Sequence, residues 1–184
     1  LLVIASDRGL CGAYNANVLR RAMQQYRAST EAGREVIVHA AGKKALAFFR
    51  FQGVEVTDSF SLGDKPAYED VERLASRYMQ EFEEGRYDAI RVIYMQFISN
   101  SRQTPQVMQL LPLEAVSPDV ADTEDGATAG ATAFEFSPSA DELLDKLLPL
   151  TVKTALFQAF NDAVVSEQIM RMVAMKAATE NAGD

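Results

Sequence analysis

The chain has 184 residues, of which 48% are hydrophobic, and its formal net charge is −8. This size and composition suit one globular domain with a hydrophobic core. No apolar run approaches the roughly 18 residues of a membrane-spanning helix, which excludes that class for this sequence. The single cysteine, Cys11, excludes an internal disulfide framework and fits a reducing compartment.

The charge is unevenly distributed along the chain. Residues 1–50 carry a net charge of +5, residues 51–150 carry −12, and residues 151–184 carry −1. An acidic middle argues against nucleic acid as a partner, because nucleic-acid binding depends on contacts from Lys and Arg to phosphates. The basic first quarter has no interleaved aromatic residues, which favours a solvated helix surface.

The chain opens with a short apolar run, residues 1–5, followed by a glycine-bracketed turn over residues 6–12. Such a run is typical of a strand buried on both faces of a parallel sheet. A helical pattern begins near Asn15, which we expect to act as its N-cap. A loop at the carboxyl end of a strand is where open α/β sheets place their binding sites.

Helices and strands then alternate along the chain, which is typical of an α/β domain. We expect a five-stranded, mostly parallel sheet with helices on both faces, hence three layers. Pro112 lies near the end of the last expected strand, as an edge strand allows. The patterns predict helices over residues 15–30, 43–51 and 68–84, and strands over residues 35–41, 54–62, 89–98 and 106–113.

The segment 117–133 is rich in Asp, Gly, Ala and Thr and contains no aromatic residue. That composition predicts a mobile acidic loop. The loop lies near the end of an α/β domain that we place over residues 1–137. Residues 138–184 form a separate C-terminal helical segment in this division.

The C-terminal segment predicts a long helix that begins at Ser139, where Glu142 completes a capping box. Pro149 is expected to bend or interrupt this helix, because proline lacks a backbone donor and clashes with the preceding turn. A helix of about 30 residues after Pro149 would be about 45 Å long. One small sheet cannot cover that length, so we expect part of the helix to leave the domain. The chain starts inside a strand and ends inside a helical pattern, which indicates a piece of a longer protein.

The first turn, D-R-G-L-C-G, does not have the residues of a phosphate-binding loop. It is not G-x-G-x-x-G and it contains no Walker lysine. Cys11 as a nucleophile would need His39, the single histidine, beside it, and we expect both residues to pack structurally. His39 also lacks the partners of a zinc site. The sequence therefore predicts no catalytic, cofactor-binding or metal-binding residues.

Two interpretations of Asp7 and Arg8 remain open on composition alone. In the first, Asp7 caps a turn while Arg8 is solvated; in the second, the two charges together meet those of a partner protein. The carboxylates of the helix over 68–84 have helix-surface spacing, which favours a solvated face over a catalytic pair.

Three segments together resemble the gamma subunit of F-type ATP synthases. They are SDRGLCGAYNANVLRRA at 6–22, LLPL at 110–113, and SEQIMRMVAMKAATENAGD at 166–184. Their order and spacing match that family, and the resemblance spans essentially the whole chain. The family has a Rossmann-like domain with a helix before its first strand and a long C-terminal helix, which together form a coiled-coil shaft. The resemblance therefore implies a globular domain with truncated shaft helices.

The resemblance implies a central-stalk rotor subunit of the proton-translocating ATP synthase. It would transmit torque between the membrane ring and the catalytic alpha and beta subunits, without catalysis, cofactors or direct nucleotide binding of its own. It would be a peripheral part of the complex at the cytoplasmic face of the cell membrane, or at the matrix or stromal side in an organelle. The alternative is a Rossmann-like nucleotide-binding enzyme. A receiver-like module would need clustered acids, and the first strand ends with only Asp7.

The same resemblance implies two sets of contact residues. Phe134, Glu135 and Phe136 fall in the segment that approaches the epsilon subunit and the membrane c-subunit ring. The residues that would contact the beta subunit are Asp7, Arg8, Gly9, Leu10, Cys11, Gly12 and Arg171.

Overall fold

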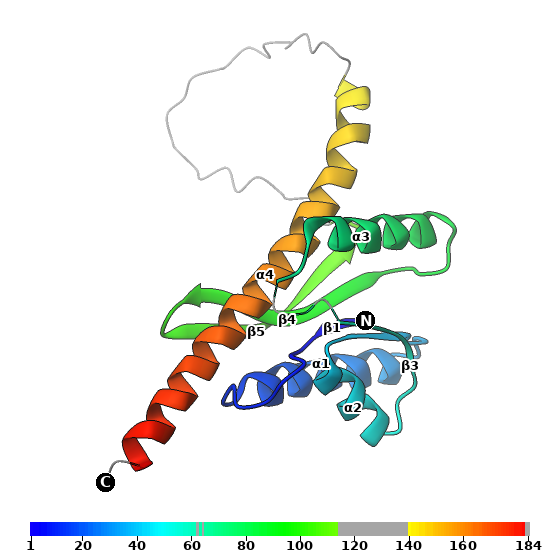
Figure 1. Cartoon of the computed structure of the whole chain (residues 1–184). Coiled ribbons are helices and arrows are strands. Elements are labelled where there is room, and N and C mark those ends of the chain that lie inside the picture. The colour runs from blue at the N-terminus through cyan, green and yellow to red at the C-terminus, as the bar shows by residue number, and fades with distance from the viewer. Residues whose placement is uncertain (62, 64, 114–139, 183–184) are drawn as a thin grey trace, which may run out of the picture.

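The computed structural model describes all residues except 62, 64, 114–139 and 183–184. The predicted acidic loop over 117–133, the segment Phe134 to Phe136 and the predicted cap Ser139 lie outside the described residues. The described chain forms one sheet with helices on both faces (Figure 1). In chain order its elements are β1 (Leu2–Ile4), α1 (Tyr14–Glu31), β2 (Val38–Ala41), α2 (Lys43–Phe51), β3 (Val56–Phe60), α3 (Tyr68–Glu83), β4 (Ile90–Ser99), β5 (Arg102–Leu111) and α4 (Ala140–Ala182).

The sheet has five strands in the order β3-β2-β1-β4-β5. The first four strands are parallel, and β5 pairs antiparallel with β4 at the edge. The predicted mostly parallel sheet is therefore confirmed. The chain adds β2 and β3 on one side of β1 and then crosses back to add β4 on the other side. This reversal leaves β1 at the centre and places a topological switch point between β1 and β4.

Two hydrophobic clusters, one on each face of the sheet, make the three layers. The two faces are covered because the chain first moves outward from β1 to β3 and then returns to add β4 on the other side of β1. Right-handed crossovers therefore place α1 and α2 on one face and α3 on the other. Along β1, Leu2 and Ile4 pack in the cluster with α3 and α4, whereas Val3 packs in the cluster with α1 and α2. All three side chains are buried, which confirms a strand covered on both faces.

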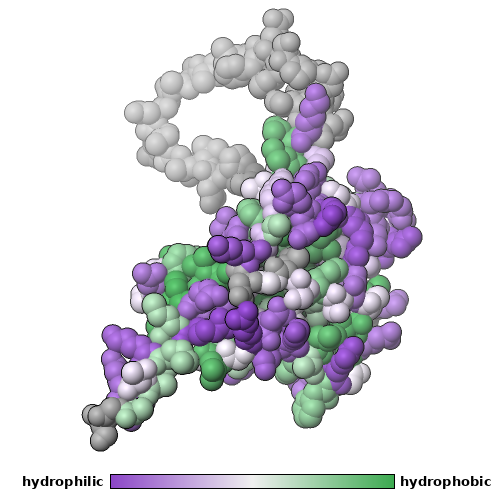
Figure 2. Space-filling view, in the orientation of Figure 1, coloured by the Kyte–Doolittle hydropathy of each residue, from purple (hydrophilic) through white to green (hydrophobic). Residues whose placement is uncertain are grey.

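The long helix α4 covers the sheet only with its middle part. Its buried apolar residues run from Val152 to Ala163 and join the same cluster as α3. Both ends project beyond the sheet (Figure 1), as expected for a helix that is too long for its domain. The exposed apolar side chains there are Leu147, Leu148 and Leu150 near the beginning and Met172, Val173 and Met175 near the end. Figure 2 shows hydrophobic side chains on the projecting C-terminal end.

Two local features differ from the expectation. Pro149 does not interrupt α4, because proline removes only one backbone donor while the residues after it pack on the sheet. The N-cap position of α1 is Ala13, which makes no side-chain capping hydrogen bond, whereas the Asn15 side chain turns back to the preceding loop. The last strand also begins at Arg102, earlier than expected, because a tight hairpin joins it to β4.

Candidate functional site

The loop that follows β1, residues 6–12, lies at the carboxyl ends of the parallel strands, beside the switch point. This is the position where open α/β sheets bind ligands. We call this segment, Ser6 to Gly12, the β1 loop. Its contacts decide whether it can cradle a phosphate or serves another purpose.

A small hydrogen-bond network inside the β1 loop determines its shape. Asn15, in the first turn of α1, accepts from the Ser6 amide at 3.1 Å and donates to Ser6 Oγ at 2.8 Å. The same side-chain amide lies 3.2 Å from Cys11 Sγ. Cys11 is only 2% exposed, so its thiol packs inside the turn rather than facing a partner.

Asp7 accepts hydrogen bonds from the beginning of α2 and from the segment that follows β3. Its Oδ1 accepts from the amide of Lys43, the first residue of α2, at 2.9 Å, and its Oδ2 accepts from Ser61 Oγ at 2.9 Å. Asp7 therefore satisfies one of the free amides at the beginning of α2. Both carboxylate oxygens of Asp7 thus accept hydrogen bonds from within the domain, as in the interpretation in which Asp7 caps a turn.

The beginning of α2 approaches the β1 loop very closely at Gly42. A Cβ atom at this position would lie 2.2 Å from the Ala5 carbonyl oxygen, and the φ of Gly42 is +94°. Only glycine fits such a position without displacement of the backbone. The close approach lets the Ser6 carbonyl accept from the Lys44 amide at 3.1 Å.

Helix α4 fills the crevice next to the β1 loop. Ser166, which is fully buried, donates to the Met95 carbonyl of β4 at 3.5 Å. A pocket of about 50 Å³ remains there, with Asp7, Tyr14 and Glu167 among the residues that line it. Pockets for small molecules and cofactors measure about 300–1,000 Å³. This crevice is therefore too small for a nucleotide in the conformation described.

Arg171 brings α4 into direct contact with the β1 loop. Its guanidinium forms an ion pair with Glu167, one helical turn earlier, and donates to the Gly9 carbonyl at 3.5 Å. The Arg171 side chain is 21% exposed and that of Glu167 is 11% exposed. Nearby, a Cβ on Gly12 would lie 3.9 Å from the Met170 carbonyl and 4.0 Å from the Ala174 Cβ, so the turn rests on the helix.

The outer surface of the β1 loop is formed by Arg8 and Leu10, which are both exposed. Leu10 is 75% exposed and has a φ of 61°. A left-handed conformation is unfavourable for a residue with a Cβ atom, and its persistence requires the surroundings to impose it. The structure therefore places Arg8 and Leu10 where a partner can reach them, while Asp7 and Cys11 hold the loop from inside.

The electrostatics of the crevice follow from burial. Tyr14 is 1% exposed at the start of α1. Burial raises the pKa of its phenol, and the negative charge of Glu167 raises it further. Tyr14 is therefore a neutral hydroxyl over the physiological pH range, so it supplies no charge to the crevice.

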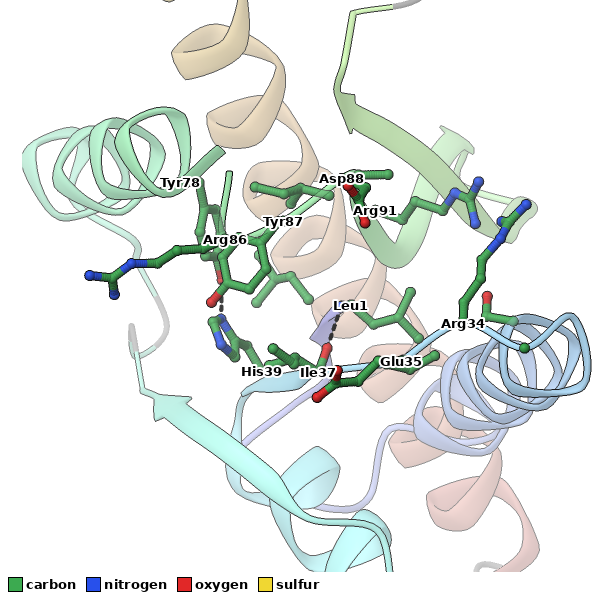
Figure 3. A pocket seen from close by; sticks show the side chains of 16 residues that line it. Leu1, Arg34, Glu35, Ile37, His39, Tyr78, Arg86, Tyr87, Asp88 and Arg91 are labelled. Atoms are coloured by element: carbon green, nitrogen blue, oxygen red, sulfur yellow. Dashed lines mark hydrogen bonds between the residues drawn. The ribbon is translucent and has the colours of Figure 1, made fainter. Parts of the chain in front are cut away.

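A larger pocket of about 420 Å³ lies at the opposite edge of the sheet, near the amino ends of β1 and β4 (Figure 3). Leu1 and Ile37 line its floor, joined by a 2.6 Å hydrogen bond from the Leu1 nitrogen to the Ile37 carbonyl. Arg34 and Arg91 also line the pocket (Figure 3). None of the predicted contact residues that the structure describes, Arg171 and those of the β1 loop, lines it.

His39 and Tyr78 also line this larger pocket. His39 Nδ1 lies 2.8 Å from the Tyr78 hydroxyl, and the two rings stack. Burial lowers the pKa of His39 to about 4, and the positive charge of Arg77 acts in the same direction. His39 is therefore neutral at pH 7 and 5% exposed, which agrees with the predicted structural role of this histidine.

The structural roles of several residues around the β1 loop could not be read from the sequence. Asn15 and Ser61 contact the loop, yet nothing in their sequence context separates them from ordinary polar residues. Glu167 and Arg171 have the i, i+4 spacing of a helix ion pair, which is a weak signal without knowledge of what the helix packs against.

The part of the chain that the structure describes contains no group of three or more His, Cys, Asp or Glu residues arranged to hold a metal ion. Within the same described ranges, no helix combines the length and apolar character needed to cross a bilayer.

Comparison with solved structures supports the fold. The chain superposes on one chain of the structure of the Tetrahymena thermophila mitochondrial ATP synthase central stalk and c-ring with a TM-score of 0.69, covering 97% of this chain and 75% of that chain at 18% identity. It superposes on the rotor of the Euglena gracilis mitochondrial ATP synthase with a TM-score of 0.63, covering 98% and 66% at 17% identity. At such identities these likenesses establish the fold.

Comparison with known sequences establishes the family. The chain is 43% identical to the ATP synthase gamma chain of Rhodopirellula baltica, over all of this chain and 62% of the relative. It is 37% identical to that of Rubrobacter xylanophilus, over 98% of this chain and 61% of the relative. The chain thus spans about three fifths of the length of these curated relatives. The family model described as ATP synthase matches residues 1–184. The chain therefore belongs to this ATP synthase family, in which the curated relatives that it matches are gamma chains.

Proposed function

We propose that this chain is part of the central-stalk rotor subunit of a proton-translocating ATP synthase, which transmits torque between the membrane ring and the catalytic alpha and beta subunits. Family membership supports this assignment. The observation that carries it furthest is the contact between the β1 loop and α4, a helix that projects beyond the sheet at both ends. A projecting helix with a surface loop held against it is suited to passing force from one partner to another.

The β1 loop is the proposed contact with the beta subunit. Arg8 and Leu10 form its exposed surface, while Gly12, with a φ of +55°, lies against α4 and the Gly9 carbonyl accepts from Arg171. Arg171 acts in this proposal mainly from behind the loop, because its guanidinium is engaged with Glu167 and Gly9. An exposed cation and an exposed apolar side chain on a firmly held turn fit an acidic, partly apolar partner surface.

The remaining partners of the proposal are the alpha subunits, the epsilon subunit and the c-subunit ring. Phe134, Glu135 and Phe136 stay the proposed contacts with epsilon and the ring. The complex would hold this chain peripherally at the cytoplasmic face of the cell membrane, or at the matrix or stromal side in an organelle. In this role the subunit is non-catalytic, and ATP binds elsewhere in the complex.

The competing function is that of a Rossmann-like nucleotide-binding enzyme, and it is not favoured. The crevice at the switch point is occupied by α4 and retains only about 50 Å³. Titration calorimetry of the full-length chain with ATP and with NAD tests the proposal directly. We expect no binding at micromolar concentrations of either nucleotide. Micromolar affinity would contradict the rotor proposal and favour the enzyme.

A further inference from the structure

Glu167 is the one buried carboxylate in the part of the chain that the structure describes. It lies on α4 beneath the β1 loop and lines the small pocket there together with Tyr14 and Arg8. A buried carboxylate is unfavourable unless a cation or several donors compensate it. Its partner is Arg171, which is itself largely covered.

We propose that Glu167 is a positioning residue for the β1 loop, acting through Arg171. The carboxylate holds the guanidinium in the orientation from which it donates to the Gly9 carbonyl, and this contact keeps residues 9–12 against α4. The proposal rests on the assignment of the β1 loop as a partner contact. It adds the residue that makes loop and helix move as one body.

The geometry of the turn explains why such a residue is needed. Leu10 adopts a left-handed conformation while its side chain is 75% exposed, so its own packing contributes little to holding it. On its inner side the turn is held by the network of Ser6, Asn15 and Cys11. On the side of α4 it is restrained by Arg171, which donates to the Gly9 carbonyl, and by the close approach of Gly12 to the helix. A planar guanidinium can pair with a carboxylate and donate to a carbonyl at the same time.

A second ion pair on α4 shows what an ordinary surface pair looks like. Lys176 and Glu180 have the same i, i+4 spacing, but their atoms are 3.8 Å apart and their side chains are 76% and 67% exposed. Such an exposed pair is worth little. Glu180 therefore provides a matched control, with the same residue type on the same helix and a basic partner one turn away, but without the buried contact to a loop.

The direct test is hydrogen exchange at the backbone amide of Tyr14, whose 3.2 Å hydrogen bond to the Cys11 carbonyl closes the turn, measured in the full-length chain without its partners. Glu167→Gln retains the side-chain shape and removes the charge. We expect exchange in the turn to become at least about tenfold faster, since hydrogen bonds that involve a charged group are the stronger ones. Glu180→Gln should leave exchange in the turn unchanged. Unchanged exchange in a folded Glu167→Gln chain would overturn the proposal.

A double variant separates positioning from a general loss of packing. If Glu167 acts through Arg171, then adding Glu167→Gln to Arg171→Ala should not accelerate exchange in the turn beyond Arg171→Ala alone. Additive acceleration would overturn the proposed route. Should Glu167→Gln fail to fold, Arg171→Lys decides, because lysine keeps the charge but lacks the planar fork. Faster exchange in the turn of that variant supports the proposal, and unchanged exchange contradicts it.

This test and the proposed function fail in different ways. Exchange in the turn is a property of the chain by itself, whereas torque transmission requires the assembled enzyme. Faster exchange in Glu167→Gln with normal coupling of ATP hydrolysis to proton pumping would support the positioning role and count against the loop as a torque-bearing contact. Normal exchange would refute the positioning role whatever the coupling.

Discussion

The sheet has a carboxyl edge, where its parallel strands end, and an amino edge, where they begin. The two differ in how much empty space they leave. At the carboxyl edge, α4 occupies the crevice and the β1 loop is held by Asn15, Asp7 and Arg171, which leaves about 50 Å³. At the amino edge a pocket of about 420 Å³ remains open. A pocket large enough for a small molecule therefore lies away from the position where this class of fold builds its sites. A firmly held loop over a filled crevice is suited to contact and force rather than to a ligand.

The largest expected effect is at Gly42, where α2 meets the β1 loop. Gly42→Ala should lower the free energy of unfolding by about 3–5 kcal/mol, because the new Cβ would meet the Ala5 carbonyl and the φ is positive. Gly53→Ala is the matched control, with a φ of +71° and no atom near the added Cβ. It should cost only about 1–2 kcal/mol. Equal losses in urea denaturation would show that the carboxyl edge is not closely packed.

A second variant tests whether α4 belongs to the packed domain. Leu156 is fully buried in the middle of α4, so Leu156→Ala should lower the free energy of unfolding by about 3 kcal/mol. Leu150 is 52% exposed near the beginning of the same helix, and Leu150→Ala should change it by less than about 0.5 kcal/mol. The same denaturation series measures both, and similar losses would contradict the filled crevice.

The amino edge is expected to respond to pH through His39. The pKa of His39 is about 4 in the folded chain and near 6.5 when unfolded, so the unfolded state binds the proton first as the pH falls. His39 should therefore destabilise the fold progressively from pH 6.5 to pH 4, by about 3 kcal/mol in total. Urea denaturation of the wild type and of His39→Gln at pH 7 and pH 4.5 isolates this contribution. An identical pH dependence in both chains would contradict it.

The smallest expected effect concerns the network inside the β1 loop. Asn15→Ala removes hydrogen bonds to Ser6 and the contact with Cys11, and should lower the free energy of unfolding by about 1 kcal/mol. Asn17, in the same first turn of α1, provides the control, because no hydrogen bond of its side chain to the loop is found among the described residues. Asn17→Ala should have the smaller effect. The reverse order would show that Asn15 does not shape the loop.

Much of the fold could be predicted because its signals are local. The apolar run before the β1 loop, the glycine after it and the alternation of helices and strands indicate an α/β domain in any context. The sequence predicts Asn15 as the N-cap of α1, but its side chain accepts from Ser6, which lies across the loop rather than in the next turn of the helix. Pro149 was expected to interrupt α4, whereas tertiary packing of later residues maintains the helix.

The place of the β1 loop in the fold could be predicted, but the contacts that hold it could not. The apolar run of residues 1–5 predicts a loop at the carboxyl end of the first strand, and residues 6–12 follow β1 there. The loop's contacts with Ser61 and Arg171 join segments 54 or more residues apart, and no sequence pattern records such pairings. The filling of the crevice by α4 depends on where a distant helix docks, which likewise needs the structure.

The central claim is that the β1 loop bears torque in the assembled enzyme. Proton pumping driven by ATP hydrolysis, measured in membrane vesicles, tests it with Arg8→Ala against Arg20→Ala, an exposed arginine on α1. If the β1 loop bears torque, Arg8→Ala lowers the number of protons pumped per ATP hydrolysed, while Arg20→Ala leaves that number unchanged. Wild-type coupling in Arg8→Ala, or an equal loss in both variants, would contradict the claim.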